Sequence, residues 1–75
     1  MADLLERITF NKAILCGKPL IRGMRIPVEM ILALMANGAT VDEILADYPQ
    51  LEPDDIRAAL LYAHHMLARE KGLDR

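Results

Sequence analysis

The chain of 75 residues contains no serine and no tryptophan, and Cys16 is its only cysteine. Because serine is absent and no histidine lies near Cys16 in the sequence, neither a hydroxyl nucleophile nor an activated thiol is expected. His64 and His65 are adjacent, so on a helix they point roughly 100° apart and cannot chelate one metal ion as an i, i+4 pair does. The sequence therefore predicts that the protein is not an enzyme and has no cofactor or metal ion.

A single cysteine also excludes an intramolecular disulfide, which fits a reducing compartment. The longest apolar run, 30–36, is too short to cross a membrane, and acidic residues stand where a signal peptide has basic ones. We expect a cytoplasmic protein with no membrane partner, in which Cys16 is a buried or half-buried thiol.

Basic residues are absent from the stretch 28–56, which nevertheless contains seven acidic residues. Residues 1–27 carry five basic and two acidic side chains, whereas residues 28–75 carry four basic and nine acidic ones. The chain is therefore a small electric dipole with a basic N-terminal arm, although its net charge is only −2.

Proline, glycine and capping residues predict where three helices begin and end. The first helix begins near Pro27 and ends at a C-terminal stop that includes Gly38. The second begins at Thr40, whose hydroxyl forms a capping box with Glu43. The third begins with Pro53 as its first residue.

Three short helices with tight turns predict a helix-turn-helix bundle over residues 28–71. An extended arm or β-hairpin, residues 8–27, precedes the bundle, and the whole chain, 1–75, is expected to form one domain. Residues 1–7 and 72–75 are predicted to be loose ends.

The third helix carries an apolar stripe that we expect to face the core. Its members are Ile56, Ala59, Leu60, Ala63 and Leu67. A second face, with Leu61, His65 and Met66, is apolar enough to mark an interface. Hydrophobic residues make up 53% of this small chain, so we expect a homodimer or a complex with another chain.

Two arginines flank Gly23 and Met24 with the spacing of a tight β-hairpin. A two-residue loop that begins with glycine predicts a type II′ turn, in which Arg22 and Arg25 face each other across the ladder. Like charges in that arrangement require a nearby anion, and Lys18 would share their face. Gly17 and Gly23 are both predicted to be structural turn residues.

Three roles stay open for Arg22 and Arg25. In the first role, they pair with Glu29 or with Asp54 and Asp55 at the start of the third helix of a second protomer. In the second role they contact a partner protein, and in the third they bind nucleic-acid phosphate.

The start of the third helix is acidic, and this opposes conventional recognition of DNA by that helix. Carboxylates at residues 52, 54 and 55 would repel the phosphate backbone. Asp54 and Asp55 are instead expected to complement the helix dipole on a solvated face. Gln50 and Arg57 are the only base-reading candidates nearby, so a hairpin with Lys18 is the better candidate for phosphate contact.

Four segments in fixed order carry the pattern of a known family. They are 17–28 (GKPLIRGMRIPV), 37–40 (NGAT), 44–51 (ILADYPQL) and 55–60 (DIRAAL). With Ile8 and Thr9 they make residues 8–65 resemble the domain-of-unknown-function 433 family. One departure is Glu52, which stands where the family often has threonine as a helix cap, so a weaker cap is expected.

The resemblance implies a mostly α protein in which a short N-terminal β-hairpin precedes a homeodomain-like helix-turn-helix bundle of three helices. It also implies an antitoxin of the VapB-like kind, which binds a PIN-like toxin and optionally its operator DNA. The alternative is a non-enzymatic, dimeric protein-interaction module whose helix-turn-helix no longer binds DNA.

Overall fold

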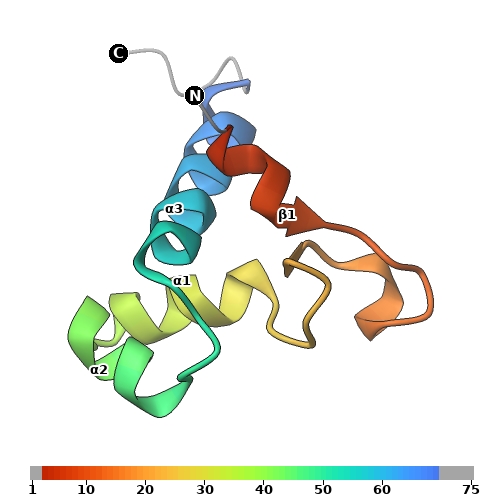
Figure 1. Ribbon diagram of the computed structural model, residues 1–75. Helices are drawn as coiled ribbons and strands as arrows, with labels where there is room; N and C mark the ends of the chain where they lie inside the picture. The colour runs from red at the N-terminus through yellow and green to blue at the C-terminus, as the bar shows by residue number, and fades with distance from the viewer. Residues whose placement is uncertain (1–2, 70–75) are drawn as a thin grey trace.

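The computed structural model describes residues 3–69, which are mostly helical (Figure 1). Two short strands form an antiparallel sheet near the N-terminus: β1 (Ile8–Thr9) and β2 (Leu20–Ile21). Three helices follow: α1 (Val28–Ala36), α2 (Val41–Asp47) and α3 (Pro53–Ala68). Two 3₁₀ turns precede the strands: η1 (Leu4–Arg7) and η2 (Leu15–Gly17). The predicted order, an antiparallel strand pair and then three helices, is confirmed.

The stop at the end of α1 has the Schellman pattern. Gly38 adopts φ +101° and donates its backbone N–H to the Met35 carbonyl at 3.0 Å. Ala39 donates to the Leu34 carbonyl, also at 3.0 Å, so both bonds of the motif are present in the last turn. The predicted end of the first helix is therefore confirmed.

Side-chain caps start the other two helices. Thr40 Oγ1 accepts from the Glu43 backbone N–H at 3.1 Å, and Glu43 Oε1 accepts from the Thr40 N–H at 2.8 Å, which confirms the predicted capping box. At α3, Asp55 Oδ2 accepts from the Glu52 N–H at 2.8 Å. A carboxylate three residues into the helix thus supports the cap at the position where Glu52 was expected to weaken it.

The tight turn near the N-terminus differs from the predicted one. Met24 donates its N–H to the Ile21 carbonyl at 2.8 Å, and the two residues between them, Arg22 and Gly23, have φ of 46° and 73°. Positive φ at both central positions defines a type I′ turn, so the type II′ assignment is wrong by one residue. Arg22 consequently occupies the turn itself and does not face Arg25 across a ladder.

The paired strands are also further apart in the sequence than predicted. Ile8 pairs with Ile21 and Thr9 with Leu20, and the loop 10–19 connects the two strands. Ile21 donates its N–H to the Ile26 carbonyl at 3.0 Å, so the chain after the turn runs back beside β2.

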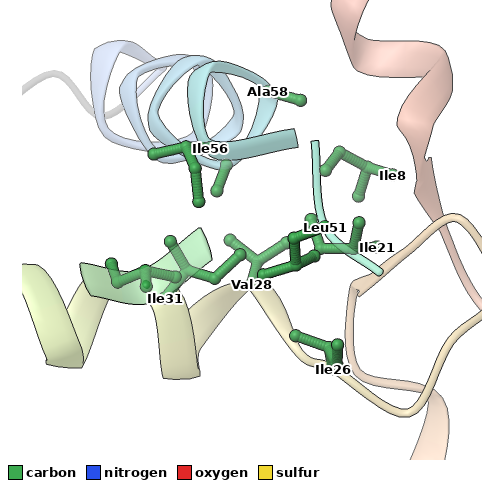
Figure 2. Packing of buried hydrophobic residues seen from close by; sticks show 10 residues of the cluster. Ile8, Ile21, Ile26, Val28, Ile31, Leu51, Ile56 and Ala58 are labelled. Atoms are coloured by element: carbon green, nitrogen blue, oxygen red, sulfur yellow. The ribbon is translucent and has the colours of Figure 1, made fainter. Parts of the chain in front are cut away.

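The core lies where the sheet, α1 and the start of α3 meet (Figure 2). Its largest fully buried apolar side chains are Leu20, Ile21, Ile31, Ile44 and Ile56. Leu51, just before α3, belongs to the same cluster and brings the α2–α3 connection onto the core.

The predicted stripe on α3 is only half correct. Ile56 and Ala59 are buried, but Leu60 and Leu67 are 45% and 55% exposed. Ala58 is fully buried in their place, because η1 packs along α3 on that side (Figure 1). The first seven residues were predicted to be a loose end, and the prediction is wrong for Leu4–Arg7; residues 72–75 lie outside the described part of the chain.

Within the described range, no helix is both long enough and apolar enough to span a lipid bilayer.

Candidate functional site

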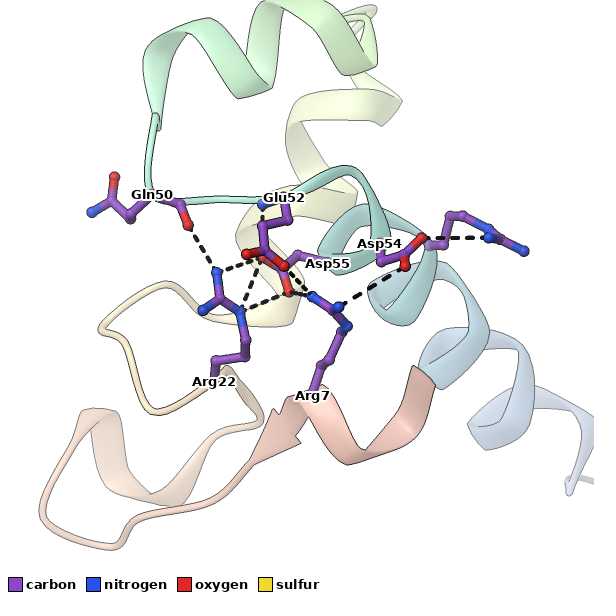
Figure 3. A network of polar contacts seen from close by, with 7 residues as sticks. Arg7, Arg22, Gln50, Glu52, Asp54 and Asp55 are labelled. Atoms are coloured by element: carbon purple, nitrogen blue, oxygen red, sulfur yellow. Dashed lines mark hydrogen bonds and ion pairs between the residues drawn. The ribbon is translucent and has the colours of Figure 1, made fainter. Parts of the chain in front are cut away.

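Asp55 is the one charged side chain that is fully buried among residues 3–69 (Figure 3). Arg22 donates to both of its oxygens, from Nε to Oδ1 at 3.0 Å and from Nη2 to Oδ2 at 2.9 Å. Arg7 donates from Nη1 to Oδ1 at 2.9 Å. We call Arg7, Arg22 and Asp55 the arginine clamp.

The sheet places the two arginines side by side. Arg7 directly precedes β1 and Arg22 directly follows β2, and the strands are antiparallel. The Arg22 backbone N–H donates to the Arg7 carbonyl at 2.7 Å. Both guanidinium groups therefore extend from adjacent positions toward the first turn of α3.

Further contacts extend the clamp along the α2–α3 connection. Arg22 Nη2 also donates to the backbone carbonyl of Gln50 at 2.8 Å. Arg7 Nη1 donates to Glu52 Oε1 at 2.8 Å, and its Nη2 lies 3.9 Å from Asp54 Oδ2. The clamp therefore joins the N-terminal strands, the turn before α3 and the helix itself.

The electrostatics of the clamp keep all three groups charged. Burial alone raises the pKa of Asp55, but hydrogen bonds from Arg22, the Glu52 backbone and Arg7 outweigh it, and the pKa lies below its ordinary value. The carboxylates in turn raise the pKa of both arginines, chiefly through their side-chain hydrogen bonds. Every buried polar side-chain atom in the described part of the chain has a hydrogen-bond partner.

These contacts give Arg22 a carboxylate partner within the chain. Its partner is Asp55 of the same chain, not of a second protomer. Asp55 is buried and not on a solvated face, so that prediction is wrong. The sequence analysis did not single out Arg7, because its partner Asp55 is 48 residues away in the chain.

The predicted anion site is not assembled by these side chains. Lys18 Nζ lies 2.6 Å from Glu29 Oε2, which raises the pKa of the lysine through that hydrogen bond. Arg25 is exposed and makes no ion pair within residues 3–69. Arg22 is held by the clamp, so the three cations have three different surroundings.

The two base-reading candidates also have separate surroundings. Arg57 is 70% exposed and lies 3.4 Å from Asp54, one turn earlier on α3. The Gln50 side chain points away from the clamp, and only its backbone carbonyl takes part (Figure 3).

Cys16 lies on the surface, so the prediction of a buried or half-buried thiol is wrong. The segment 10–17 contains no buried residue, and Leu15, Cys16 and Gly17 all have positive φ, of 50°, 59° and 78°. Gly23, the other predicted turn residue, has φ +73°. No group of three potential metal-ligating side chains occurs in the part of the chain that the structure describes.

An apolar groove of about 310 Å³ lies between α1 and the second half of α3. Its walls are Pro19, Val28, Glu29, Leu32, Tyr62, Ala63, Met66 and Leu67. Glu29 is the only charged residue among them. We call this the α1–α3 groove. Of the interface face predicted on the third helix, Met66 lines the groove, whereas Leu61 and His65 do not.

The fold and its surfaces define a small α-helical domain in which an N-terminal strand pair is clamped to the third helix. The chain belongs to the family described as "Protein of unknown function (DUF433)", whose model matches residues 8–63. The family predicted from the sequence is therefore confirmed.

Two relatives share the domain. The uncharacterized protein y4eO of Sinorhizobium fredii (strain NBRC 101917 / NGR234) is 38% identical over 63 residues, which are 84% of this chain and 28% of that protein. The crystal structure of a DUF433 member protein from Anabaena variabilis ATCC 29413 matches with a TM-score of 0.78 and 33% identity, over 84% of this chain and 62% of that one. This chain thus spans less than two thirds of either relative.

Proposed function

We propose that this chain is a non-enzymatic, antitoxin-type helix-turn-helix protein that acts by binding other proteins, including a PIN-like toxin. The observation that carries the proposal is the α1–α3 groove. An apolar concavity beside the exposed side chains of Met66 and Leu67 is typical of a surface that receives apolar side chains of another protein.

The clamp supports protein binding over DNA binding. In a helix-turn-helix, the start of the second motif helix enters the major groove, and cations around it contact phosphates. Here that helix is α3, and the cations near its start, Arg7 and Arg22, already donate to carboxylates of the same chain. Because η1 also packs along α3, Arg7 and Arg22 are not free to contact phosphates on that side of the helix.

DNA binding remains the second candidate on account of Arg57 alone, which is exposed beside the start of α3. Its pairing with Asp54 is a surface ion pair, which is weak and leaves the guanidinium available. A salt titration with promoter DNA tests this candidate: sequence-selective binding that weakens as salt rises would favour it over the pure protein-interaction module.

The experiment that tests the proposal is co-expression with the product of the neighbouring gene. We expect the two proteins to co-purify as a complex of defined mass by light scattering, and the chain to restore growth of cells in which the neighbour alone is toxic. If the neighbour is not toxic and no complex forms, the antitoxin assignment fails.

A further inference from the structure

The second half of α3 is apolar but only partly packed: residues 61–63 are half-buried and Tyr62 packs against the core, whereas the helix is exposed beyond them. No residue in 60–68 is fully buried, and the large apolar side chains of Leu60, Met66 and Leu67 are 45%, 45% and 55% exposed. In water, helices gain most of their stability from packing an apolar face, and short unpacked segments are marginal. Leu60, Met66 and Leu67 are therefore apolar side chains of α3 that no described residue buries.

The groove and the protruding side chains are formed by the same short segment. Met66 and Leu67 line the α1–α3 groove and are also exposed beside it. A two-fold rotation about an axis at this segment would bring the same side chains of a second copy to the groove of the first. Such a self-complementary arrangement is the requirement for an isologous dimer.

We propose that a second copy of this chain occupies the α1–α3 groove, so that each copy inserts Met66 and Leu67 of α3 into the groove of the other. The proposal rests on the proposed function, in which this groove docks a protein, and it names the occupant.

Charge selects this face for self-association. In an isologous interface both sides present the same patch, so a patch with charges of one sign repels its copy. The charged residue in the groove is Glu29, and Lys18 neutralises it at 2.6 Å. By contrast, the exposed face of α2 carries Asp42, Glu43 and Asp47 and no basic residue.

The size and chemistry of the groove also suit side chains better than a small ligand. About 310 Å³ is at the lower end of the range for small-molecule sites, and such sites have several converging polar groups. Here the lining is apolar apart from the neutralised Glu29 and the hydroxyl of Tyr62. Pockets of this kind receive one or two anchoring side chains in protein interfaces.

The test compares Leu67→Glu with Leu60→Glu. Both positions are exposed on α3, so neither change removes a core contact, but only Leu67 lines the groove. We expect light scattering and sedimentation equilibrium to give a dimer for the natural chain and for Leu60→Glu. The dissociation constant of Leu67→Glu should rise at least tenfold, with an unchanged helical circular dichroism spectrum. Met66→Glu should weaken the dimer in the same way.

Two results would overturn the proposal: a natural chain that stays monomeric at all concentrations, or a Leu67→Glu variant that dimerises as the natural chain does. Binding to the neighbouring gene's product is measured separately on the same variants. A monomeric chain whose toxin complex is lost in Leu67→Glu would place the toxin in the groove, so the proposed function would stand and the inference would fail. A dimer lost in Leu67→Glu without any toxin complex would support the self-association and count against the antitoxin function.

Discussion

The two halves of α3 differ in whether their side chains have partners within the chain. The first half holds Asp55, fully buried and bound by two arginines from the opposite end of the chain (Figure 3). The second half carries Leu60 and Leu67, exposed and without a cover. The charged end of the helix is thus closed within the chain, and the apolar end is open. The sequence predicted that Leu60 and Leu67 face the core, and for Arg22 it left carboxylate pairing, partner contact and phosphate binding open.

The clamp explains why its charges contribute to folding. Removing a buried charge from water costs several kcal/mol, so a buried pair stabilises a fold only when all its hydrogen bonds are made. Asp55 accepts from two guanidinium groups and one backbone N–H, and the arginines remain partly exposed to water. Stability should therefore fall most when the buried carboxylate of the clamp is replaced.

The largest expected effect is that of Asp55→Asn. The amide keeps the shape of the side chain but removes the charge that both arginines require, so the free energy of unfolding should fall by about 3 kcal/mol. Asp54→Asn is the matched control, because the Asp54 carboxylate is next to Asp55 in the sequence but is half exposed. This substitution should lower the free energy of unfolding by less than about 1 kcal/mol. Urea denaturation measures both. Equal effects of the two substitutions would mean that the clamp does not stabilise the fold.

Arg22→Ala and Arg25→Ala separate the arginine in the turn from the one that follows it. Arg22→Ala removes three side-chain hydrogen bonds to Asp55, and we expect a loss of about 2 kcal/mol in the free energy of unfolding. Arg25→Ala should change it by less than about 0.5 kcal/mol, since this side chain is exposed. If Arg25→Ala instead abolished partner binding at full stability, Arg25 would be a contact residue for that partner.

Local patterns in the sequence predicted the helices because their partners are close by. The Thr40–Glu43 capping box spans three residues, and the Gly38 stop bonds within one turn. Each depends on residue type and spacing alone, so the starts and ends of the helices could be predicted without the tertiary structure.

The clamp could not be predicted in the same way. Arg22 and Asp55 are 33 residues apart, and their approach depends on the register of β1 with β2. The separation of a basic arm from an acidic middle indicated pairing and made Asp55 one possible partner of Arg22, but it placed Asp55 in a second protomer and did not indicate Arg7. The exposed half of α3 was missed for a geometric reason: α3 has 16 residues and α1 has nine, so the helical stripe continues beyond the body that could bury it.

Acid should unfold the protein partly through the clamp. Because the pKa of Asp55 is lower in the folded chain than in the unfolded one, its contribution to stability is complete above the unfolded value. That contribution is lost as the pH falls through the folded pKa, when the carboxylate is protonated between two arginines. Thermal midpoints between pH 7 and pH 2 should therefore fall more steeply for the natural chain than for Asp55→Asn; parallel curves would contradict the clamp's role.

A smaller effect is expected at the turn that places Arg22. Gly23 has φ +73°, and a Cβ there would meet no atom within 4 Å, so a substitution is resisted by backbone strain alone. Gly23→Val should cost about 1–2 kcal/mol, because a β-branched residue disfavours positive φ. Met24→Val tests the neighbouring position, where φ is not positive, and should be tolerated better in thermal denaturation. Equal losses would argue against a type I′ turn in solution.

The smallest expected effect is that of Arg57→Ala, and it bears on the open question of DNA. The side chain is 70% exposed and makes a 3.4 Å pair with Asp54, so the free energy of unfolding should change by less than about 0.5 kcal/mol. Binding to a protein partner through the second half of α3 should not change either, because Arg57 is on the closed half of the helix. A loss of promoter binding in this variant, at full stability, would show that the start of α3 meets DNA although the clamp occupies its other arginines.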